Sequence, residues 1–157
     1  MNYILKETLI SSIINALFSI AFFVAMFHNK TELILGGTSG LTMDFLPQAF
    51  FVGLFAALPS SLLTLKRLRM GAVSPVGKKR LPLPQSLPVR LGCLTLASLI
   101  LFGGGTVLIL SLSGPMELSF VTALVVKAVY GILITIIITP LAVGYLISLS
   151  SFLPDKE

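Results

Sequence analysis

One lysine, Lys127, lies inside an apolar stretch that is long enough to cross a bilayer. It follows the start of this stretch by about 10 residues, a depth of up to ~15 Å in a helix that rises 1.5 Å per residue. A lysine at the centre of a bilayer costs about 3 kcal/mol on insertion scales, so a buried ammonium here would serve a function or stabilise the fold. The alternative is that the ammonium snorkels to the outer headgroups. The sequence leaves both interpretations open.

A buried Lys127 would need polar partners, and the chain offers a small set of them. They are Asn15, Asp44, Gln48 and Glu117, and together with Lys127 they form the candidate binding site. Asp44 and Glu117 also precede apolar stretches, and a carboxylate at a helix N-terminus is favoured by the helix dipole. An embedded cation of this kind predicts an anion or a proton as the species that it meets.

The sequence has no constellation of residues that is typical of catalysis. His28 is the chain's one histidine and Cys93 its one cysteine, too few for a metal site, so we expect no metal, no cofactor and no enzyme. Gly37-Thr38-Ser39-Gly40 resembles the nucleophile segment of rhomboid-type intramembrane proteases. In that family the histidine comes from a later helix, whereas His28 precedes Ser39, which argues against that activity.

The composition indicates a chain that is solvated by lipid. Of 157 residues, 55% are hydrophobic and 11% are charged, and the mean hydropathy is +1.02. A soluble domain carries about 25% charged residues. A span needs ~20 apolar residues to cross ~30 Å of hydrocarbon, so the length accommodates one domain, residues 1–157, with four spans.

Apolar length and the polar or Gly/Pro breaks between apolar stretches predict the elements. We expect transmembrane helices over residues 8–27, 45–65, 91–112 and 118–148. The fold class is then all-α: a polytopic membrane protein of two antiparallel helical hairpins. Short turns are expected at the outer ends, with Asp44 as the N-cap of the second helix. The fourth helix is longer than the hydrocarbon is thick, so we expect a kink at Pro140.

The connection over residues 66–90 orients the molecule. It holds seven of the eleven Lys and Arg residues and no carboxylate. Basic loops stay in the cytoplasm, so an even number of spans places both termini there as well. The rest of the chain has four basic against six acidic side chains, so the local excess predicts anionic lipid headgroups, not nucleic acid, as its partner. The residues assigned to headgroup binding are Lys66, Arg67, Arg69, Lys78, Lys79, Arg80 and Arg90.

Small residues recur at i, i+4 spacing, the pattern that lets transmembrane helices approach closely. One row lies on the second predicted helix, and a row on the fourth contains Lys127 itself. Three successive glycines in the third helix are either part of a packing seam or a local unwinding that exposes carbonyls to a solute. The residues assigned to helix packing are Ala49, Gly53, Ala57, Ser61, Gly103, Gly104, Gly105 and Gly131.

The first two predicted helices carry a resemblance. Residues 45–59 read FLPQAFFVGLFAALP and are followed by the basic stop Lys66-Arg67-Leu68-Arg69. This pattern resembles an uncharacterised bacterial family of small two-helix membrane hairpins, whose second helix similarly ends in proline and a basic stop. The resemblance covers mainly residues 1–70. It implies a bacterial cytoplasmic (inner) membrane, and the family has no established activity to carry over to this chain. A similar Met-acid start, Met43-Asp44 and Met116-Glu117, leaves a duplication of the hairpin open.

Three classes of function remain. The first and preferred one is a non-enzymatic helical bundle that serves as an accessory subunit of a larger membrane complex or forms a homo-oligomer. The second is a small oligomeric transporter or channel that uses Lys127 to meet an anion or a proton. The third is an intramembrane enzyme, which the residues support least.

Overall fold

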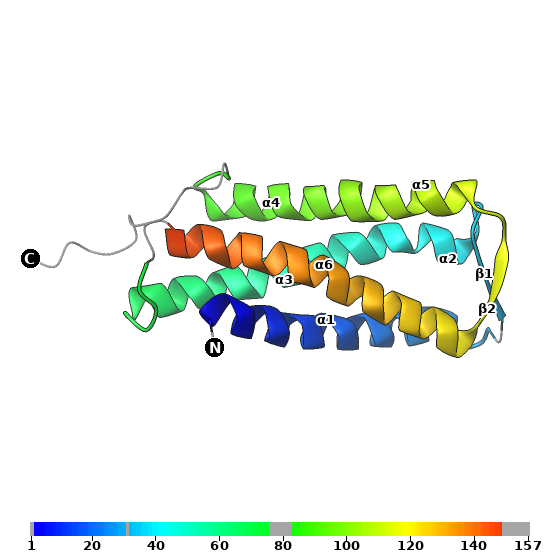
Figure 1. The fold of residues 1–157 in the computed structure, drawn as a ribbon, viewed down its shortest axis with the longest axis horizontal. Coiled ribbons are helices and arrows are strands. Elements are labelled where there is room, and N and C mark those ends of the chain that lie inside the picture. Colours follow the sequence, from blue (N-terminus) through cyan, green and yellow to red (C-terminus); the bar gives the residue numbers. More distant parts are fainter. Residues whose placement is uncertain (1, 31, 76–82, 149–157) are drawn as a thin grey trace, which may run out of the picture.

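The computed structural model describes residues 2–30, 32–75 and 83–148 as long helices joined at one end by a small sheet (Figure 1). The helical elements are α1 (Tyr3–Phe27), α2 (Gly40–Met43), α3 (Phe45–Arg69), α4 (Leu87–Ala97), η1 (Ser98–Gly104), α5 (Gly105–Leu112) and α6 (Phe120–Ser148). The strands are β1 (Glu32–Leu35) and β2 (Met116–Ser119). Because α2 runs into α3 and α4 runs through η1 into α5, these elements make four long helices.

All four long helices in this part of the chain are long and apolar enough to cross a membrane, which confirms the predicted spans as elements. Three of them extend further than predicted: α1 begins at Tyr3, α3 ends at Arg69 and α4 begins at Leu87. In the first two, the extension has a partner. The added turns hold Glu7 and Arg67, which form an ion pair between the two helices. Glu and Arg are good helix formers, but an estimate from hydropathy excludes them because they are charged.

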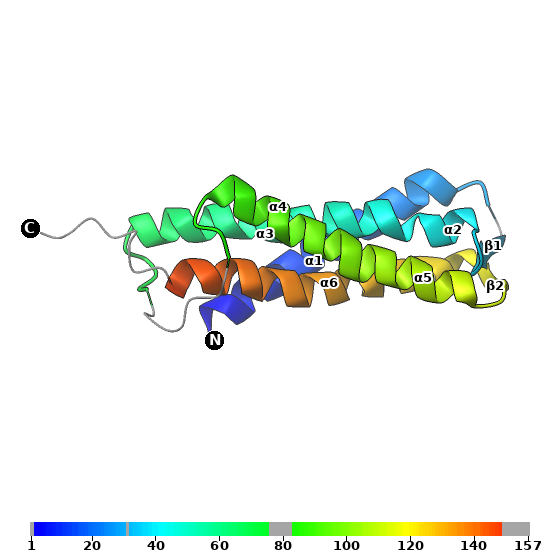
Figure 2. The same ribbon diagram turned by 90° about the horizontal axis from the view of Figure 1, so that it is seen from above.

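The two ends of the bundle differ (Figures 1 and 2). The strands β1 and β2 lie at one end, which we name the sheet end. The N-terminus, the end of α3, the start of α4 and the end of α6 lie at the other, which we name the basic end. Lys66, Arg67 and Arg69 are in the last turn of α3, so the predicted basic connection leaves the bundle at the basic end.

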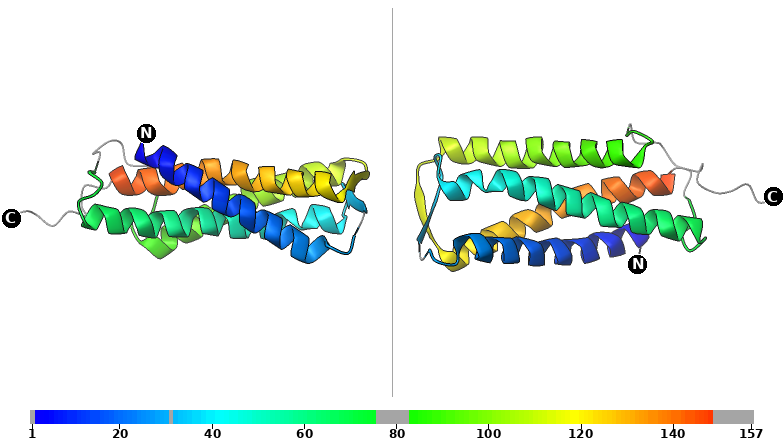
Figure 3. Two further views of the ribbon diagram at one scale, coloured as in Figure 1. Left: turned by 90° about the horizontal axis from the view of Figure 1, so that it is seen from below. Right: turned by 180° about the vertical axis from the view of Figure 1, so that it is seen from behind.

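Helices α3 and α6 form the centre of the bundle and pack against each other. Helix α6 also packs along α1, and α3 also packs against α4 and η1. Figure 3 shows α6 crossing the bundle diagonally, and Figure 1 shows α4 and α5 on the far side from α1. The most extensive packing is between α1 and α6, not between the sequence neighbours α1 and α3. Helix α6 continues through Pro140 to Ser148.

The sheet end is a feature that the turn signals did not predict. β1 and β2 pair antiparallel, with Leu33 opposite Leu118. Gly36, with φ of 103°, lies very close to the turn between α5 and β2. A Cβ on Gly36 would stand 2.5 Å from the Gly114 carbonyl oxygen. Beside it, Gly37 N–H donates a hydrogen bond to Leu110 O at 3.0 Å. This pairing joins segments that are far apart in the sequence, so local turn signals cannot indicate it.

The third span keeps its helix through the glycine triplet. Ser98–Gly104 form a π-helix, whose wider turns bond N–H groups to carbonyls five residues away. The local unwinding considered from the sequence is not seen in this segment. Instead, Ser98 Oγ donates to Ala49 O at 2.8 Å, and a Cβ at Gly103 would lie 3.0 Å from the Ala49 Cβ. The wider turns therefore bring this span onto α3.

The second span begins one turn earlier than predicted, and its N-cap is Ser39, not Asp44. The Ser39 Oγ accepts a hydrogen bond from Thr42 N–H at 3.3 Å at the start of α2. Asp44 has helical φ and ψ of −67° and −11°, and its side chain makes no capping hydrogen bond. Its carboxylate is therefore available to the interior of the bundle.

Candidate functional site

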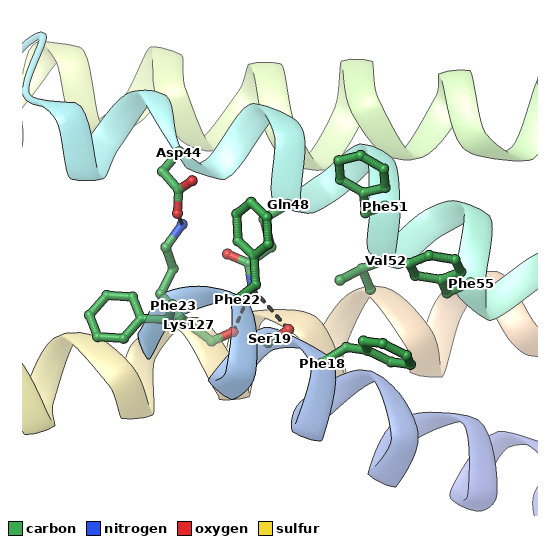
Figure 4. A pocket seen from close by; sticks show the side chains of 10 residues that line it. All are labelled: Phe18, Ser19, Phe22, Phe23, Asp44, Gln48, Phe51, Val52, Phe55 and Lys127. Carbon is green, nitrogen blue, oxygen red and sulfur yellow. Dashed lines mark hydrogen bonds and ion pairs between the residues drawn. The ribbon is translucent and has the colours of Figure 1, made fainter. Parts of the chain in front are cut away.

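The candidate site is built around an ion pair inside the bundle. Lys127 on α6 and Asp44 at the junction of α2 and α3 approach to 2.8 Å between Nζ and Oδ2 (Figure 4). Only 2% of the lysine side chain and 8% of the aspartate side chain are exposed. The Lys127 ammonium is therefore buried inside the bundle and does not snorkel to the outer headgroups. Each charge cancels the other, which is what makes such burial tolerable.

Lys127 keeps hydrogen-bonding capacity after this pairing. Its Nζ lies 3.8 Å from the centroid of the Phe45 ring, a cation–π contact that covers one side of the ammonium. An ammonium carries three N–H donors. Among the described residues Nζ has no hydrogen-bond partner besides Asp44 in the ion pair. The protein therefore leaves part of the donor capacity of Nζ unused while it also encloses the atom.

Gln48 on α3 joins three helices at the same level. Its Nε2 donates to Ser19 Oγ on α1 at 3.2 Å and to the backbone carbonyl of Lys127 on α6 at 2.8 Å. These bonds use both amide protons, whereas the buried Oε1 has no hydrogen-bond partner in the described part of the chain. A buried acceptor without a partner costs about 1–3 kcal/mol, so an O–H or N–H group placed there would be stabilising.

A cavity of about 210 Å³ lies between α1 and α3 beside these polar groups. Four polar residues line it: Ser19, Asp44, Gln48 and Lys127. The other lining residues are apolar and mostly aromatic, and they are Phe18, Phe22, Phe23, Phe51, Val52 and Phe55. Figure 4 shows Asp44 and Lys127 toward one end of the cavity, beside Phe23, and Phe55 toward the other end.

Phenylalanines from two helices form one wall of the cavity. Phe18 on α1 stacks on Phe55 on α3 with ring centroids 5.3 Å apart, and the Phe22 and Phe51 centroids are 6.4 Å apart. Phe18, Phe22 and Phe51 are also 53%, 41% and 44% exposed on the outside of the bundle. Side chains that are apolar and exposed on a spanning helix face lipid. Only aromatic side chains therefore separate the cavity from the bilayer on this side.

The sequence analysis did not identify these phenylalanines as site residues, although the signal for them is present. Phe18 and Phe22 are four residues apart, as are Phe51 and Phe55. This spacing puts both members of each pair on one face of their helix. Aromatic residues at helical spacing are common in lipid-facing and packed surfaces, so the spacing alone does not distinguish a binding site.

Two of the predicted partners of Lys127 lie elsewhere. Asn15 forms a separate polar layer with α6, where its Nδ2 donates to Thr135 Oγ1 at 3.0 Å. Glu117 is exposed in β2, opposite Ile34, because the residues before Phe120 form a strand and not the first turn of α6. The structure therefore brings Asp44 and Gln48 to Lys127, but not Asn15 or Glu117.

The residues predicted to pack helices differ in how tightly they are packed. Ala49, Ala57 and Ser61 are fully buried on α3. A Cβ added to Gly53 would lie 2.6 Å from the Ser98 Cβ, and one added to Gly131 would lie 2.5 Å from the Ser19 Oγ. These glycines thus permit close approach of α3 to η1 and of α6 to α1. The remaining members are Gly103, which contacts Ala49, and the partly exposed Gly104 and Gly105.

The residues predicted to bind headgroups also differ among themselves. Lys66 and Arg69 are exposed at the end of α3. Arg67 is partly exposed, pairs with Glu7 and lies over the Tyr3 ring. Arg90 contradicts the prediction, because it is 1% exposed and lies over the Tyr145 ring at 4.8 Å, where burial keeps it from a headgroup. The three other members, Lys78, Lys79 and Arg80, lie outside the described residues.

The residues considered for metal binding or catalysis do not come together. Among residues 2–30, 32–75 and 83–148, no three His, Cys, Asp or Glu side chains are close enough to hold a metal ion. Ser39 Oγ caps α2, and His28 is exposed after the end of α1, with its Nδ1 3.4 Å from Ala25 O. The structure instead brings Lys127, Asp44 and Gln48 together beside an apolar cavity.

The fold and the site together define a bundle of four helices able to cross a membrane, with a buried ion pair beside an aromatic cavity. No protein-family model, no curated protein and no solved structure matches the chain. The functional argument therefore rests on the site itself.

Proposed function

We propose that this chain is a non-enzymatic integral membrane protein that binds a small lipophilic molecule in the cavity between α1 and α3. The observation that carries the proposal is the cavity, whose walls are mostly aromatic and whose few polar lining residues include the Asp44–Lys127 ion pair. Small-molecule sites are typically concave and mostly apolar, with a few polar groups that fix orientation. The cavity between α1 and α3 has this composition.

The ligand reaches the cavity sideways, from the bilayer. Phe18, Phe22 and Phe51 are exposed on the outside of the bundle and also line the cavity. Rotation of exposed side chains takes place in picoseconds to nanoseconds, so this wall can open without movement of a helix. A molecule dissolved in the hydrocarbon needs no passage through water to bind. This path favours a lipophilic ligand over a water-soluble one.

Two sequence-based expectations are less well supported than ligand binding. The small-residue rows that favoured an accessory subunit or a homo-oligomer are occupied by the chain's own helices, since Gly53 faces Ser98 and Gly131 faces Ser19. An anion or proton path would need a free Lys127 ammonium, whereas Asp44 pairs with it. Both observations support a binding site inside one chain over a partner interface or an ion path.

The proposal includes an orientation. We infer that the basic end faces the cytoplasm of a bacterial cell and the sheet end faces outward, with both termini on the inner side. The support is the positive-inside rule applied to residues 66–90, together with the position of the N-terminus and the end of α6 at the basic end (Figure 1).

Cysteine accessibility tests this orientation. With Cys93 replaced by serine, Ser119→Cys should react with an impermeant maleimide in intact cells, and Ser86→Cys only after permeabilisation; the reverse pattern would overturn it.

Photolabelling tests the binding function. The full chain is placed in lipid nanodiscs with a single-chain lipophilic probe that carries a diazirine, and labelled residues are mapped by mass spectrometry. We expect saturable labelling concentrated on residues 18–23 and 51–55, because these segments line the cavity. Excess unlabelled lipophile should suppress this labelling. Labelling spread evenly over all lipid-facing residues, without saturation, would refute the proposal.

A filled cavity provides a second test. Val52 lines the cavity, so Val52→Phe should reduce labelling of both segments. The matched control is Leu62→Phe on the same helix, since Leu62 is 50% exposed and is not among the lining residues. Helix content measured by circular dichroism identifies a variant that has lost its fold. Equal labelling of a folded Val52→Phe variant would contradict a ligand in this cavity.

A further inference from the structure

We propose that the ligand of this cavity is a small aromatic hydrocarbon of one or two rings. This inference rests on the proposed function and names the class of molecule that the site takes. It is carried by three features of the cavity: its enclosed polar groups, its aromatic wall and its volume.

The polar residues beside the cavity offer almost nothing to a ligand. Gln48 donates its two amide protons to Ser19 Oγ and to the Lys127 carbonyl, and the Lys127 ammonium pairs with Asp44. Gln48 Oε1 and Lys127 Nζ are themselves enclosed by protein. The surface that lines the cavity is therefore almost wholly apolar. An O–H or N–H group of a ligand would find no partner there, which is unfavourable, so the ligand is a hydrocarbon.

The surrounding lipid decides which kind of hydrocarbon binds. A hydrocarbon that leaves the bilayer for this cavity gains no hydrophobic free energy, because lipid tails are as apolar as the cavity wall. Its affinity must come from close van der Waals contact with the wall and from a small loss of conformational freedom. An alkyl chain has many rotatable bonds to fix, whereas a ring system has none. A rigid molecule is therefore favoured over a flexible chain of similar size.

Four of the phenylalanines drawn in Figure 4 form one continuous wall of the cavity. Phe18 stacks on Phe55 with ring centroids 5.3 Å apart, and Phe55 stacks on Phe51 at 6.2 Å. The Phe51 ring in turn lies 6.4 Å from the Phe22 ring, tilted by 44°. Aromatic rings attract one another in offset-stacked and edge-to-face arrangements more strongly than their contact area alone provides. An aromatic ligand is therefore favoured over a saturated ligand of similar shape.

The volume limits the ligand to one or two rings. The cavity measures about 210 Å³. An engineered apolar cavity of about 150 Å³ in another protein holds benzene, and pockets for drug-sized ligands enclose about 300–1,000 Å³. The cavity between α1 and α3 lies between these sizes, so it accepts a substituted benzene or two fused rings.

Competition among hydrocarbons of equal carbon number tests this assignment. Naphthalene, its saturated counterpart decalin and the flexible chain decane compete with the diazirine probe for the full chain in nanodiscs. We expect naphthalene to suppress labelling of residues 18–23 and 51–55 at about tenfold lower membrane concentration than decane, with decalin between them. A fourth competitor, 1-naphthol, should be no stronger than naphthalene, because its hydroxyl group finds no partner in the apolar lining.

A variant of the wall links this preference to the site. Phe55 contacts both Phe18 and Phe51, so Phe55→Leu interrupts the wall while it keeps an apolar side chain. In this variant the preference for naphthalene over decane should fall from about tenfold to about threefold or less. Phe102→Leu is the matched control, because Phe102 is partly exposed on η1 and is not among the lining residues. The control should keep the full preference.

The outcomes separate this assignment from the binding function. Competition by decane or decalin equal to that by naphthalene, stronger competition by 1-naphthol, or an unchanged preference in a folded Phe55→Leu variant would overturn the aromatic hydrocarbon. Saturable labelling of the same segments would still support the binding function in each of these cases. Absence of saturable labelling by the diazirine probe would overturn both.

Discussion

Removal of one member of the Asp44–Lys127 ion pair should destabilise the bundle more than removal of both. In Lys127→Met the Asp44 carboxylate stays 8% exposed and loses the cation 2.8 Å away. In Asp44→Asn the buried ammonium loses its counter-charge and keeps the Phe45 ring and one amide oxygen as favourable neighbours. In the double variant no charge is left behind, and the methionine chain fills much of the volume of the lysine chain.

The magnitudes follow from these environments. Loss of one partner of a buried pair costs about 3–5 kcal/mol, because the other charge is left uncompensated. We expect Asp44→Asn near the lower figure, since the cation–π contact of Lys127 with Phe45 persists and is worth about 2 kcal/mol when desolvated. We expect Lys127→Met near the upper figure, and the double variant within about 1 kcal/mol of the parent. Lys30→Met is the matched control, because Lys30 is exposed, and its effect should be below about 0.5 kcal/mol.

The measurement is reversible unfolding in mixed micelles of increasing dodecyl sulfate fraction, followed by circular dichroism. The four-variant cycle gives the coupling free energy between the two residues directly. A double variant whose loss equals the sum of the two single losses would show that the charges do not stabilise each other.

The same unfolding assay checks two further predictions, and lipid binding checks a third. Gly131→Ala should lower the free energy of unfolding by about 1–3 kcal/mol, because its Cβ would lie 2.5 Å from an oxygen of α1. Gly105→Ala should raise it by up to about 1 kcal/mol, because no atom lies within 4 Å of its Cβ. Equal effects would contradict the close approach of α1 and α6. Arg67→Met should lower the free energy of unfolding by about 1–3 kcal/mol and Glu7→Gln by less than about 1 kcal/mol, since only Arg67→Met leaves a buried carboxylate without its cation. The opposite order would refute the assignment of Glu7 as the buried member of this ion pair. Lys66→Gln should weaken retention of anionic lipid by the purified protein about fivefold, as loss of ~1 kcal/mol predicts, and unchanged retention would count against headgroup binding at this end of α3.

The fold was predictable to the extent that hydropathy determines it. Four apolar stretches of sufficient length give four helices, because the backbone of a lipid-solvated segment must satisfy its own hydrogen bonds. The pairing of β1 with β2 and the contact of Gly36 with Gly114 were not predictable, since they join distant segments and carry no local signal. The π-helix at Ser98–Gly104 depends on how the third span meets α3, which the sequence of one span does not contain.

The site was predictable in its charged residues and not in its shape. Lys127 stands out because a charge inside an apolar helix requires a partner, and Asp44 and Gln48 were among the four candidates for it. The sequence could not choose among them, because the choice depends on where α2 begins: Ser39 caps that helix and leaves the Asp44 carboxylate to the interior. The cavity depends on how α1 and α3 diverge around their phenylalanines, which is a property of the packed bundle.

The pairing of β1 with β2 limits how this molecule can move. A carrier that works by alternating access rocks its two halves apart first on one face of the membrane and then on the other. Here β1 leads into α2 and α3, β2 leads into α6, and the pairing between them would have to break before the halves could part at that face. A hydrogen bond from Gly37 N–H to Leu110 O also ties the first of these connections to the last turns of α5. A bundle joined at one face in this way suits lateral exchange of the proposed ligand with the surrounding lipid better than it suits transport across the membrane.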